Sequence, residues 1–136
     1  MGTTSGVTII VYSFGSKSKE RLQGVHPQLV KVMEEAIKSS PLDFSITQGL
    51  RTLEQQKALF ESGKSQTMRS RHLTGHAVDI AVLVDGKVTW ELPKYRIVTD
   101  HIKSVAKKLG VPIECGIDWT SFIDGPHIQL PWSVFP

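Results

Sequence analysis

Two pairs of an imidazole and a carboxylate are the residues in this chain best suited to chemistry. In the first pair His72 precedes Asp79 by seven residues, with Gly75 between them, and in the second Asp124 precedes His127 by three. Catalytic zinc sites use three protein ligands, commonly nitrogen or oxygen donors, and leave a fourth position for water. His72, Asp79 and His127 meet that count, so these spacings are typical of a mononuclear metal site.

The remaining carboxylate of these pairs, Asp124, has a different candidate role. A zinc ion lowers the pKa of its bound water to about 7, and a nearby carboxylate can then accept the proton. Asp124 could be that carboxylate. The spacings alone leave open a purely structural, hydrogen-bonding role for all four residues, because the sharper H-E-x-x-H motif is absent.

Helices and short strands are predicted around these residues. Apolar residues at helical spacing, a capping box at Thr52 and Gln55 and closing glycines predict helices over 27–40 and 53–62 and one that ends at Leu109 before Gly110. Alternating or buried apolar runs predict strands over 44–47, 78–84, 87–90, 112–115 and 127–130, with a turn at 85–86. This order of elements indicates an α+β fold with a small, mostly antiparallel sheet and helices packed against it.

The predicted elements place the candidate residues at junctions. His72 falls in a loop and Asp79 on a strand, and Gly75 can supply the turn that lets the two side chains converge. Arg51 lies between a strand and a helix, where side chains tend to point into clefts.

Length and composition indicate one folded domain spanning residues 1–136, with residues 1–12 as a loosely ordered extension. The chain has 40% hydrophobic and 21% charged residues, which is ordinary globular usage. Its net charge of +3 is scattered along the sequence, so no nucleic-acid-binding stripe is indicated. The single cysteine, Cys115, excludes an internal disulfide and is expected to be buried.

The apolar run at residues 7–11 is too short to cross a membrane and lacks the flanks of a signal peptide. We therefore expect a monomeric protein that is made in the cytoplasm and does not insert into membranes.

The segment Ser70–Asp79 matches S-x-H-x-x-G-x-A-x-D at all five fixed positions. This pattern resembles the signature of the zinc D-Ala-D-Ala carboxypeptidase family, which includes phage L-alanyl-D-glutamate endopeptidases that act as endolysins. The similarity continues in residues 48–52, in 116–119 and in Asp124-x-x-His127, and so covers the chain from about Tyr12 to its end. It implies a LAS-type metallopeptidase fold with the zinc site in a cleft.

The resemblance also implies roles for individual residues. His72, Asp79 and His127 correspond to the ligands of one zinc ion, and Asp124 to the general base that later protonates the leaving amine. Arg51 resembles the family arginine that holds a substrate carboxylate or the developing oxyanion. Four further residues are expected to bind substrate or to support the ligands: Gln48, Ser70, Asp118 and Trp119.

Some histidines and one departure from the family pattern need separate interpretation. Many relatives carry Glu at the base position, whereas this chain has Asp124, as the endolysin branch tolerates. His76 lies four residues after His72 and is an alternative metal ligand, although Asp79 would then have no role. His26 and His101 lie at predicted helix margins, where surface or capping roles are expected.

The resemblance implies a bacteriolytic enzyme of phage type that hydrolyses the L-Ala–D-Glu bond of the peptidoglycan stem peptide and acts on the cell wall after release from the cytoplasm. A D,D-carboxypeptidase that trims terminal D-Ala is the alternative, because it would share the same metal, base and fold. Outside the enzymes, an inactive wall-binding module and a small basic nucleic-acid binder remain alternatives.

Overall fold

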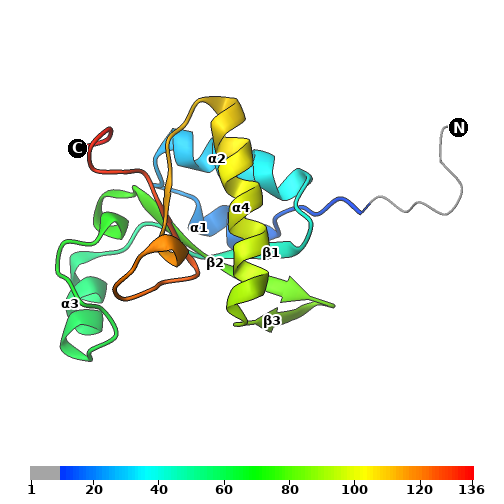
Figure 1. Ribbon diagram of the computed structural model, residues 1–136. Coiled ribbons are helices and arrows are strands. Elements are labelled where there is room, and N and C mark those ends of the chain that lie inside the picture. Colours follow the sequence, from blue (N-terminus) through cyan, green and yellow to red (C-terminus); the bar gives the residue numbers. More distant parts are fainter. Residues whose placement is uncertain (1–9) are drawn as a thin grey trace, which may run out of the picture.

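One antiparallel sheet organises the chain, for which a computed structural model describes residues 10–136 (Figure 1). Strands β1, β2, β5 and β4 lie side by side in that order, and β3 pairs with β2 as a hairpin. The strands span Asp43–Gln48 (β1), Ala77–Val84 (β2), Lys87–Thr89 (β3), Glu114–Cys115 (β4) and His127–Gln129 (β5). The α+β class predicted from the sequence is therefore confirmed.

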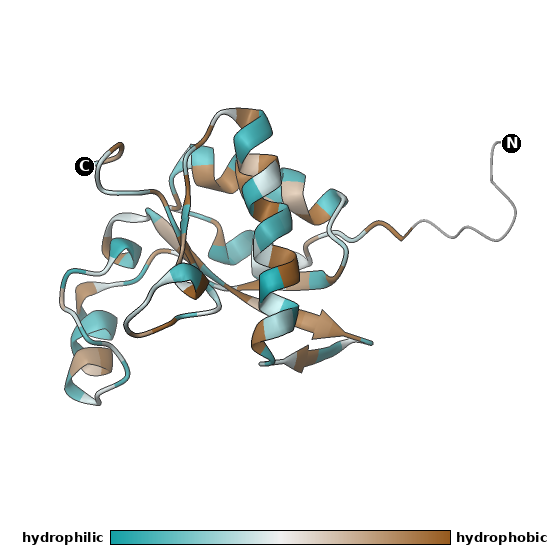
Figure 2. Ribbon diagram, in the orientation of Figure 1, coloured by the Kyte–Doolittle hydropathy of each residue, from teal (hydrophilic) through white to brown (hydrophobic). Residues whose placement is uncertain are grey.

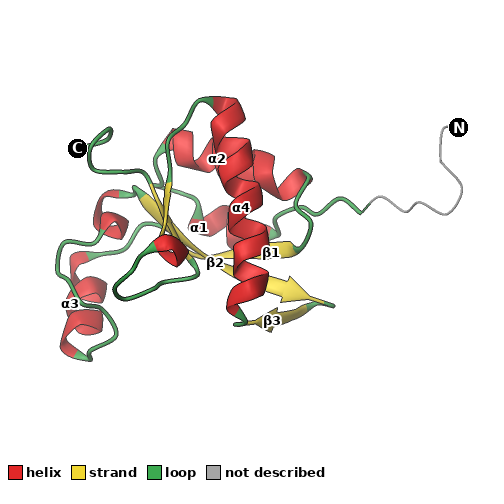
Figure 3. Cartoon of the chain, in the orientation of Figure 1, coloured by secondary structure: helices red, strands yellow, loops and turns green. Residues whose placement is uncertain are grey.

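In the described residues, two α-helices precede β1, and two further α-helices and two 3-10 turns lie between later strands (Figure 3). The helices span Ser16–Arg21 (α1), Pro27–Lys38 (α2), Leu53–Glu61 (α3) and Leu92–Leu109 (α4), and the 3-10 turns span Arg71–Thr74 (η1) and Gly116–Asp118 (η2). The expected loose extension over residues 1–12 falls mainly on residues 1–9, which lie outside the described part. No helix among residues 10–136 is both long and apolar enough to span a bilayer.

The hydrophobic core lies between the sheet and the paired helices α2 and α4. In Figure 2 the strand β2 is brown along much of its length, whereas α2 and α4 alternate between brown and teal, as expected for helices with one buried face. Residues at helical spacing, such as Leu29 and Met33 of α2 and Ile102 of α4, are fully buried in one cluster with Phe44 and Ile80 of the sheet. This core fixes β2, the strand that carries Asp79.

The predicted helix boundaries are largely confirmed. Thr52 and Gln55 form the reciprocal capping box at the start of α3, and Gly110 adopts the left-handed conformation that ends α4. Two features were not predicted. Helix α4 begins as early as Leu92, and α1 was missed because its sequence has no apolar stripe. Helix α1 is held instead by its side chains, since the Ser18 hydroxyl accepts a hydrogen bond from the backbone of β1.

Cys115 is buried and unpaired, as expected from the sequence. Burial raises the pKa of its thiol to about 12, so Cys115 is neutral and unreactive at physiological pH.

Candidate metal centre

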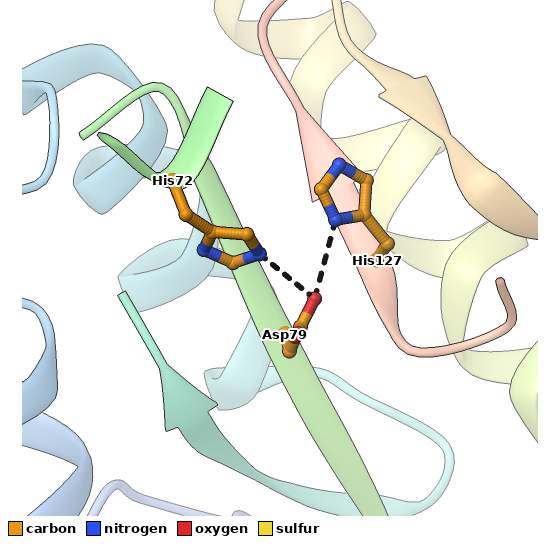
Figure 4. A group of neighbouring side chains, drawn as sticks. All are labelled: His72, Asp79 and His127. Atoms are coloured by element: carbon orange, nitrogen blue, oxygen red, sulfur yellow. Dashed lines mark hydrogen bonds and ion pairs between the residues drawn. The ribbon is translucent and has the colours of Figure 1, made fainter. Parts of the chain in front are cut away.

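Two neighbouring strands and a 3-10 turn bring the three predicted ligands together (Figure 4). Asp79 on β2 lies directly opposite His127 on β5 in the antiparallel register, although 48 residues separate them in sequence. His72 lies in η1, immediately before β2, and Figure 4 shows its ring and the ring of His127 on two sides of the Asp79 carboxylate. The pairing of β2 with β5 is therefore what unites the two sequence motifs.

The return of the chain from η1 into β2 depends on Gly75. Its φ is +76°, a left-handed conformation that residues with a Cβ adopt unfavourably. A Cβ at this position would also lie 2.3 Å from the carbonyl oxygen of Gly24. Glycine is thus required both for the turn and for the close approach, which confirms the turn predicted between His72 and Asp79.

The distances among the three side chains suit a small tetrahedral ion. Asp79 Oδ1 lies 3.2 Å from His72 Nε2 and 3.3 Å from His127 Nδ1, and one candidate atom from each residue lies within 4.8 Å of the others. Ligands of tetrahedral zinc, with bonds of about 2.0–2.1 Å, are about 3.3 Å apart. The separations between Asp79 and the two imidazoles therefore match those of zinc ligands.

The outer nitrogen of each imidazole is committed to a hydrogen bond that fixes its proton. His72 Nδ1 lies 2.8 Å from the carbonyl oxygen of Gly49, which can only accept, so Nδ1 donates. His127 Nε2 lies 2.7 Å from Gln129 Oε1, and the Gln129 amide donates in turn to the Glu114 carboxylate. Because the amide nitrogen faces Glu114, its oxygen faces the histidine, and Nε2 of His127 also donates.

In their neutral forms, both imidazoles therefore point a lone pair at the Asp79 carboxylate, and three acceptors would face one another with no donor between them. A cation resolves this conflict, and it can be a proton or a metal ion. When the two imidazoles are protonated, their hydrogen bonds to the Asp79 carboxylate have a larger effect than its burial. They hold the pKa of Asp79 well below its usual range. The pKa of His127 is raised by Asp79 despite burial. The cluster is thus built around a positive charge.

Asp124 lies beside this cluster without belonging to it. It lines the same cleft as the three ligands, and its backbone N–H donates to the carbonyl of Gly116 at 3.0 Å. A Cβ on Gly116 would lie 2.4 Å from the Asp124 carbonyl oxygen, so this close contact requires glycine. Burial, followed by the negative charge of Asp79, raises the pKa of the Asp124 carboxyl. Two carboxylates in one cleft with opposite pKa shifts are suited to different chemical roles.

Arg51 approaches the cluster from the junction of β1 and α3, as the sequence predicted. It is buried, and its guanidinium donates to Gln56 Oε1 at 2.6 Å and to Gln48 Oε1 at 2.7 Å. Its Nη2 lies 3.9 Å from Asp79 Oδ2. The Ser70 hydroxyl accepts from the His72 backbone and lies 3.4 Å from Arg51, so Ser70 links the arginine to η1.

Asp118 ends the η2 turn and Trp119 follows it directly, but the two side chains have different partners. Trp119 lines the cleft, with its ring centroid 5.2 Å from that of His127. The expectation that Asp118 orients a ligand histidine is wrong, because its carboxylate pairs with Arg96 and Lys103 on α4. Asp118 therefore ties the η2 loop to the helix.

The other histidines have structural contacts. His76 lies 2.7 Å from the Thr74 hydroxyl and next to the His26 ring, outside the metal cluster. His26 caps α2 by accepting a hydrogen bond from the Gln28 backbone, which confirms its expected role. His101 lies in the middle of α4 and contacts the carbonyl of Ala36 near the end of α2.

Gln129 is the residue of this site that the sequence prediction missed. Side chains two apart on a strand point to the same face, so Gln129 follows His127 toward the cleft. A polar residue two positions after a ligand histidine was the signal that could have identified it.

We expect the Gln129→Leu variant to bind zinc about 10- to 100-fold more weakly, because the hydrogen bond that fixes the His127 ring is lost. Titration with a competing zinc chelator measures this change. Gln23→Leu, the same substitution at an exposed site in the turn after α1, should keep the affinity of the unmodified chain. Equal affinities for both variants would show that Gln129 does not position the ligand.

His72, Asp79 and His127 line a cleft of about 820 Å³. Trp119, Phe122 and Ile123 from the loop before β5 form one part of its lining, and the segment between α3 and η1 forms another. A cleft of this size accommodates a short peptide segment.

Comparisons with known proteins give a consistent result. The family described as phage L-alanyl-D-glutamate peptidase matches residues 10–130. The L-alanyl-D-glutamate peptidase of Escherichia phage T5 is 33% identical over 134 residues, which cover 88% of this chain and 98% of the relative. That of Listeria phage A118 is 41% identical over 98 residues, which cover 71% of this chain but 34% of the relative. The crystal structure of the Serratia marcescens L-Ala D-Glu endopeptidase ChiX matches with a TM-score of 0.85 and 41% identity, covering 89% of this chain and 91% of ChiX.

Proposed function

Because the chain belongs to the phage L-alanyl-D-glutamate peptidase family, we propose that it hydrolyses the bond between L-alanine and D-glutamate in the stem peptides of peptidoglycan. The observation that carries this proposal is the arrangement of two imidazole lone pairs and one carboxylate around a single point, with Asp124 beside them in a peptide-sized cleft. The cell wall is accordingly the proposed place of action.

One zinc ion is the proposed cofactor, held by His72, Asp79 and His127. The donor set fits zinc because two nitrogens and one oxygen leave a fourth tetrahedral position open. When bound, zinc supplies Lewis acidity and lowers the pKa of a water molecule to about 7. The chain's own contribution is to hold both rings with their lone pairs inward, through Gly49 and Gln129.

Asp124 is the proposed carrier of the proton. Its carboxylate accepts a proton from the attacking water, whose oxygen forms a bond to the carbonyl carbon of L-alanine. As the carbon–nitrogen bond breaks, Asp124 delivers that proton to the amine of D-glutamate. A raised pKa suits both halves of this task, because the carboxyl group must accept and release a proton in one turnover.

Arg51 is the proposed partner of the scissile carbonyl oxygen. Its two hydrogen bonds to Gln48 and Gln56 leave the guanidinium fixed beside the cluster, where charge develops during attack. A donor that is already oriented stabilises this charge without reorganisation. Trp119 is proposed to contact the substrate from the neighbouring loop.

The names of the relatives favour the endopeptidase over the D,D-carboxypeptidase that the sequence motifs left open. The free acid Asp124 beside the three ligands favours an enzyme over an inactive wall-binding module.

Digestion of purified peptidoglycan distinguishes the two peptidase reactions. We expect mass spectrometry of the products to show stem peptides that begin with D-glutamate, together with glycan strands that carry single L-alanine residues in place of stem peptides. The matched control is the same digestion after treatment of the enzyme with a chelator. Release of free D-alanine without new D-glutamate termini would instead identify a carboxypeptidase.

A further inference from the structure

Two basic residues of the α3–η1 segment, which we define as residues 62–70, face the cleft of the metal centre. Lys64 and Arg69 both line this cleft, and both are exposed. Among residues 10–136, neither forms an ion pair with a carboxylate, in contrast to Arg96 or Lys38. Their charges are therefore available to a ligand in the cleft.

The other basic side chains that line the cleft, Arg51 and Arg71, already have partners. Arg51 donates to two glutamine side chains, and the buried Arg71 donates to the carbonyls of Leu130 and Phe135. Glu114 accepts a hydrogen bond from Gln129. Within residues 10–136, Arg69 and Lys64 are thus the cations of the cleft whose charged groups have no hydrogen bond or ion pair.

Arg69 is held in place by an aromatic ring. Its guanidinium carbon lies 5.5 Å from the centroid of Trp132, within the range of a cation–π interaction. The same ring lies 4.1 Å from the guanidinium carbon of Arg71, so Trp132 is anchored to a buried residue. Contact with a ring restrains a guanidinium while its N–H groups remain able to donate in its plane. Arg69 is therefore a positioned donor at the wall of the cleft.

The proposed substrate offers a matching acceptor on only one side of the cut bond. L-Alanine uses its amine and its carboxyl group in amide bonds, so it carries no charge. D-Glutamate has two carboxyl groups, and only one can join the next residue of the stem. The other is a free carboxylate, or a carboxamide in stems that are amidated at this position.

We propose that Arg69, together with Lys64 of the same α3–η1 segment, binds the free carboxylate of the D-glutamate that follows the cut bond, and so makes the enzyme selective for stems that are not amidated there. This inference rests on the proposed function. A guanidinium and a carboxylate form paired, charge-assisted hydrogen bonds, and a carboxamide has no charge and offers one acceptor oxygen in place of two.

The test compares two synthetic peptides, N-acetyl-L-Ala-γ-D-Glu-L-Lys-amide and the same peptide with the D-Glu carboxylate replaced by a carboxamide. The unmodified enzyme should cleave the acid with a kcat/KM about fivefold higher than the amide, as expected for a partly solvated ion pair. Arg69→Gln should remove most of this preference by raising KM for the acid, with little change in kcat. Arg69→Lys should retain part of it.

Lys87→Gln is the matched control, because it removes one positive charge at an exposed site on β3 outside the cleft. This variant should keep the full preference for the acid. The same preference in Arg69→Gln as in the unmodified enzyme would overturn the inference, as would equal cleavage of both peptides by the unmodified enzyme. If the zinc-loaded enzyme cleaves neither of these peptides nor peptidoglycan at the L-Ala–D-Glu bond, the proposed function itself fails.

Discussion

Replacing Asp124 with asparagine is expected to lower kcat/KM for peptidoglycan peptides by about 100- to 10,000-fold, the usual contribution of a general base. The amide has nearly the same shape as the carboxylate but cannot accept a proton from water. Because Asp124 lies outside the three-residue cluster, the variant should still bind one zinc ion per chain. Steady-state kinetics, together with metal analysis of the same preparation, measure both quantities.

Asp85→Asn is the matched control for this variant. Asp85 lies in the turn between β2 and β3 with a positive φ of 52°, a conformation that asparagine also tolerates. The control should retain the activity of the unmodified chain. Loss of zinc from the Asp124 variant would show that Asp124 is a metal ligand. Full activity of the variant would show that Asp124 does not carry the proton.

Replacing His72 with alanine is expected to remove both the zinc and the hydrolytic activity. The variant leaves two ligands, and the Asp79 carboxylate then lacks one of the two imidazoles that flank it (Figure 4). In the unmodified chain, a chelator should abolish activity and added zinc should restore it, because neutral imidazoles and a carboxylate bind the ion reversibly. Metal content by mass spectrometry and activity after dialysis measure these effects.

His76→Ala tests whether this loss is specific, since His76 lies four residues from His72 but contacts Thr74 and His26 outside the cluster. The control should keep zinc and activity. Equal loss in the two variants would point to a general effect on η1, and activity that survives prolonged chelation would exclude a metal mechanism.

The sequence predicted that His72, Asp79 and His127 come together because these residues lie in motifs with fixed spacing. Gly75 between His72 and Asp79 indicated the turn, and the left-handed φ of this glycine confirms it. The helices at 27–38 and 53–61 were also predictable, because the apolar stripe of the first and the capping box of the second are local features. What the sequence could not supply was the pairing of β2 with β5, which depends on contacts between distant residues.

The supporting residues were harder to predict for the same reason. Asp118 lies close in sequence to Trp119 and Asp124, but its carboxylate turns away to Arg96 and Lys103 on α4. Gln129 holds His127 through a contact between alternate residues of a three-residue strand, too short for a clear alternating pattern. Local sequence patterns do not indicate which long-range partner a polar side chain will choose.

The arrangement also gives two acidic residues of one cleft different properties. Asp79 lies between two imidazoles, whose hydrogen bonds hold its pKa low and favour its ionised form. Asp124 is buried near that negative charge and has no such partners, so its pKa is raised. The difference comes from which element carries each acid, since Asp79 lies on the central strand and Asp124 on the loop before β5.

The most direct test of the metal centre is an anomalous difference map from a crystal of the zinc-loaded protein, measured above and below the zinc absorption edge. We expect one strong peak, present only above the edge, within bonding distance of His72 Nε2, Asp79 Oδ1 and His127 Nδ1, with the Asp124 carboxylate outside that distance. A map with no peak among these three side chains, or with the peak bound by Asp124 in place of one of them, would contradict the account.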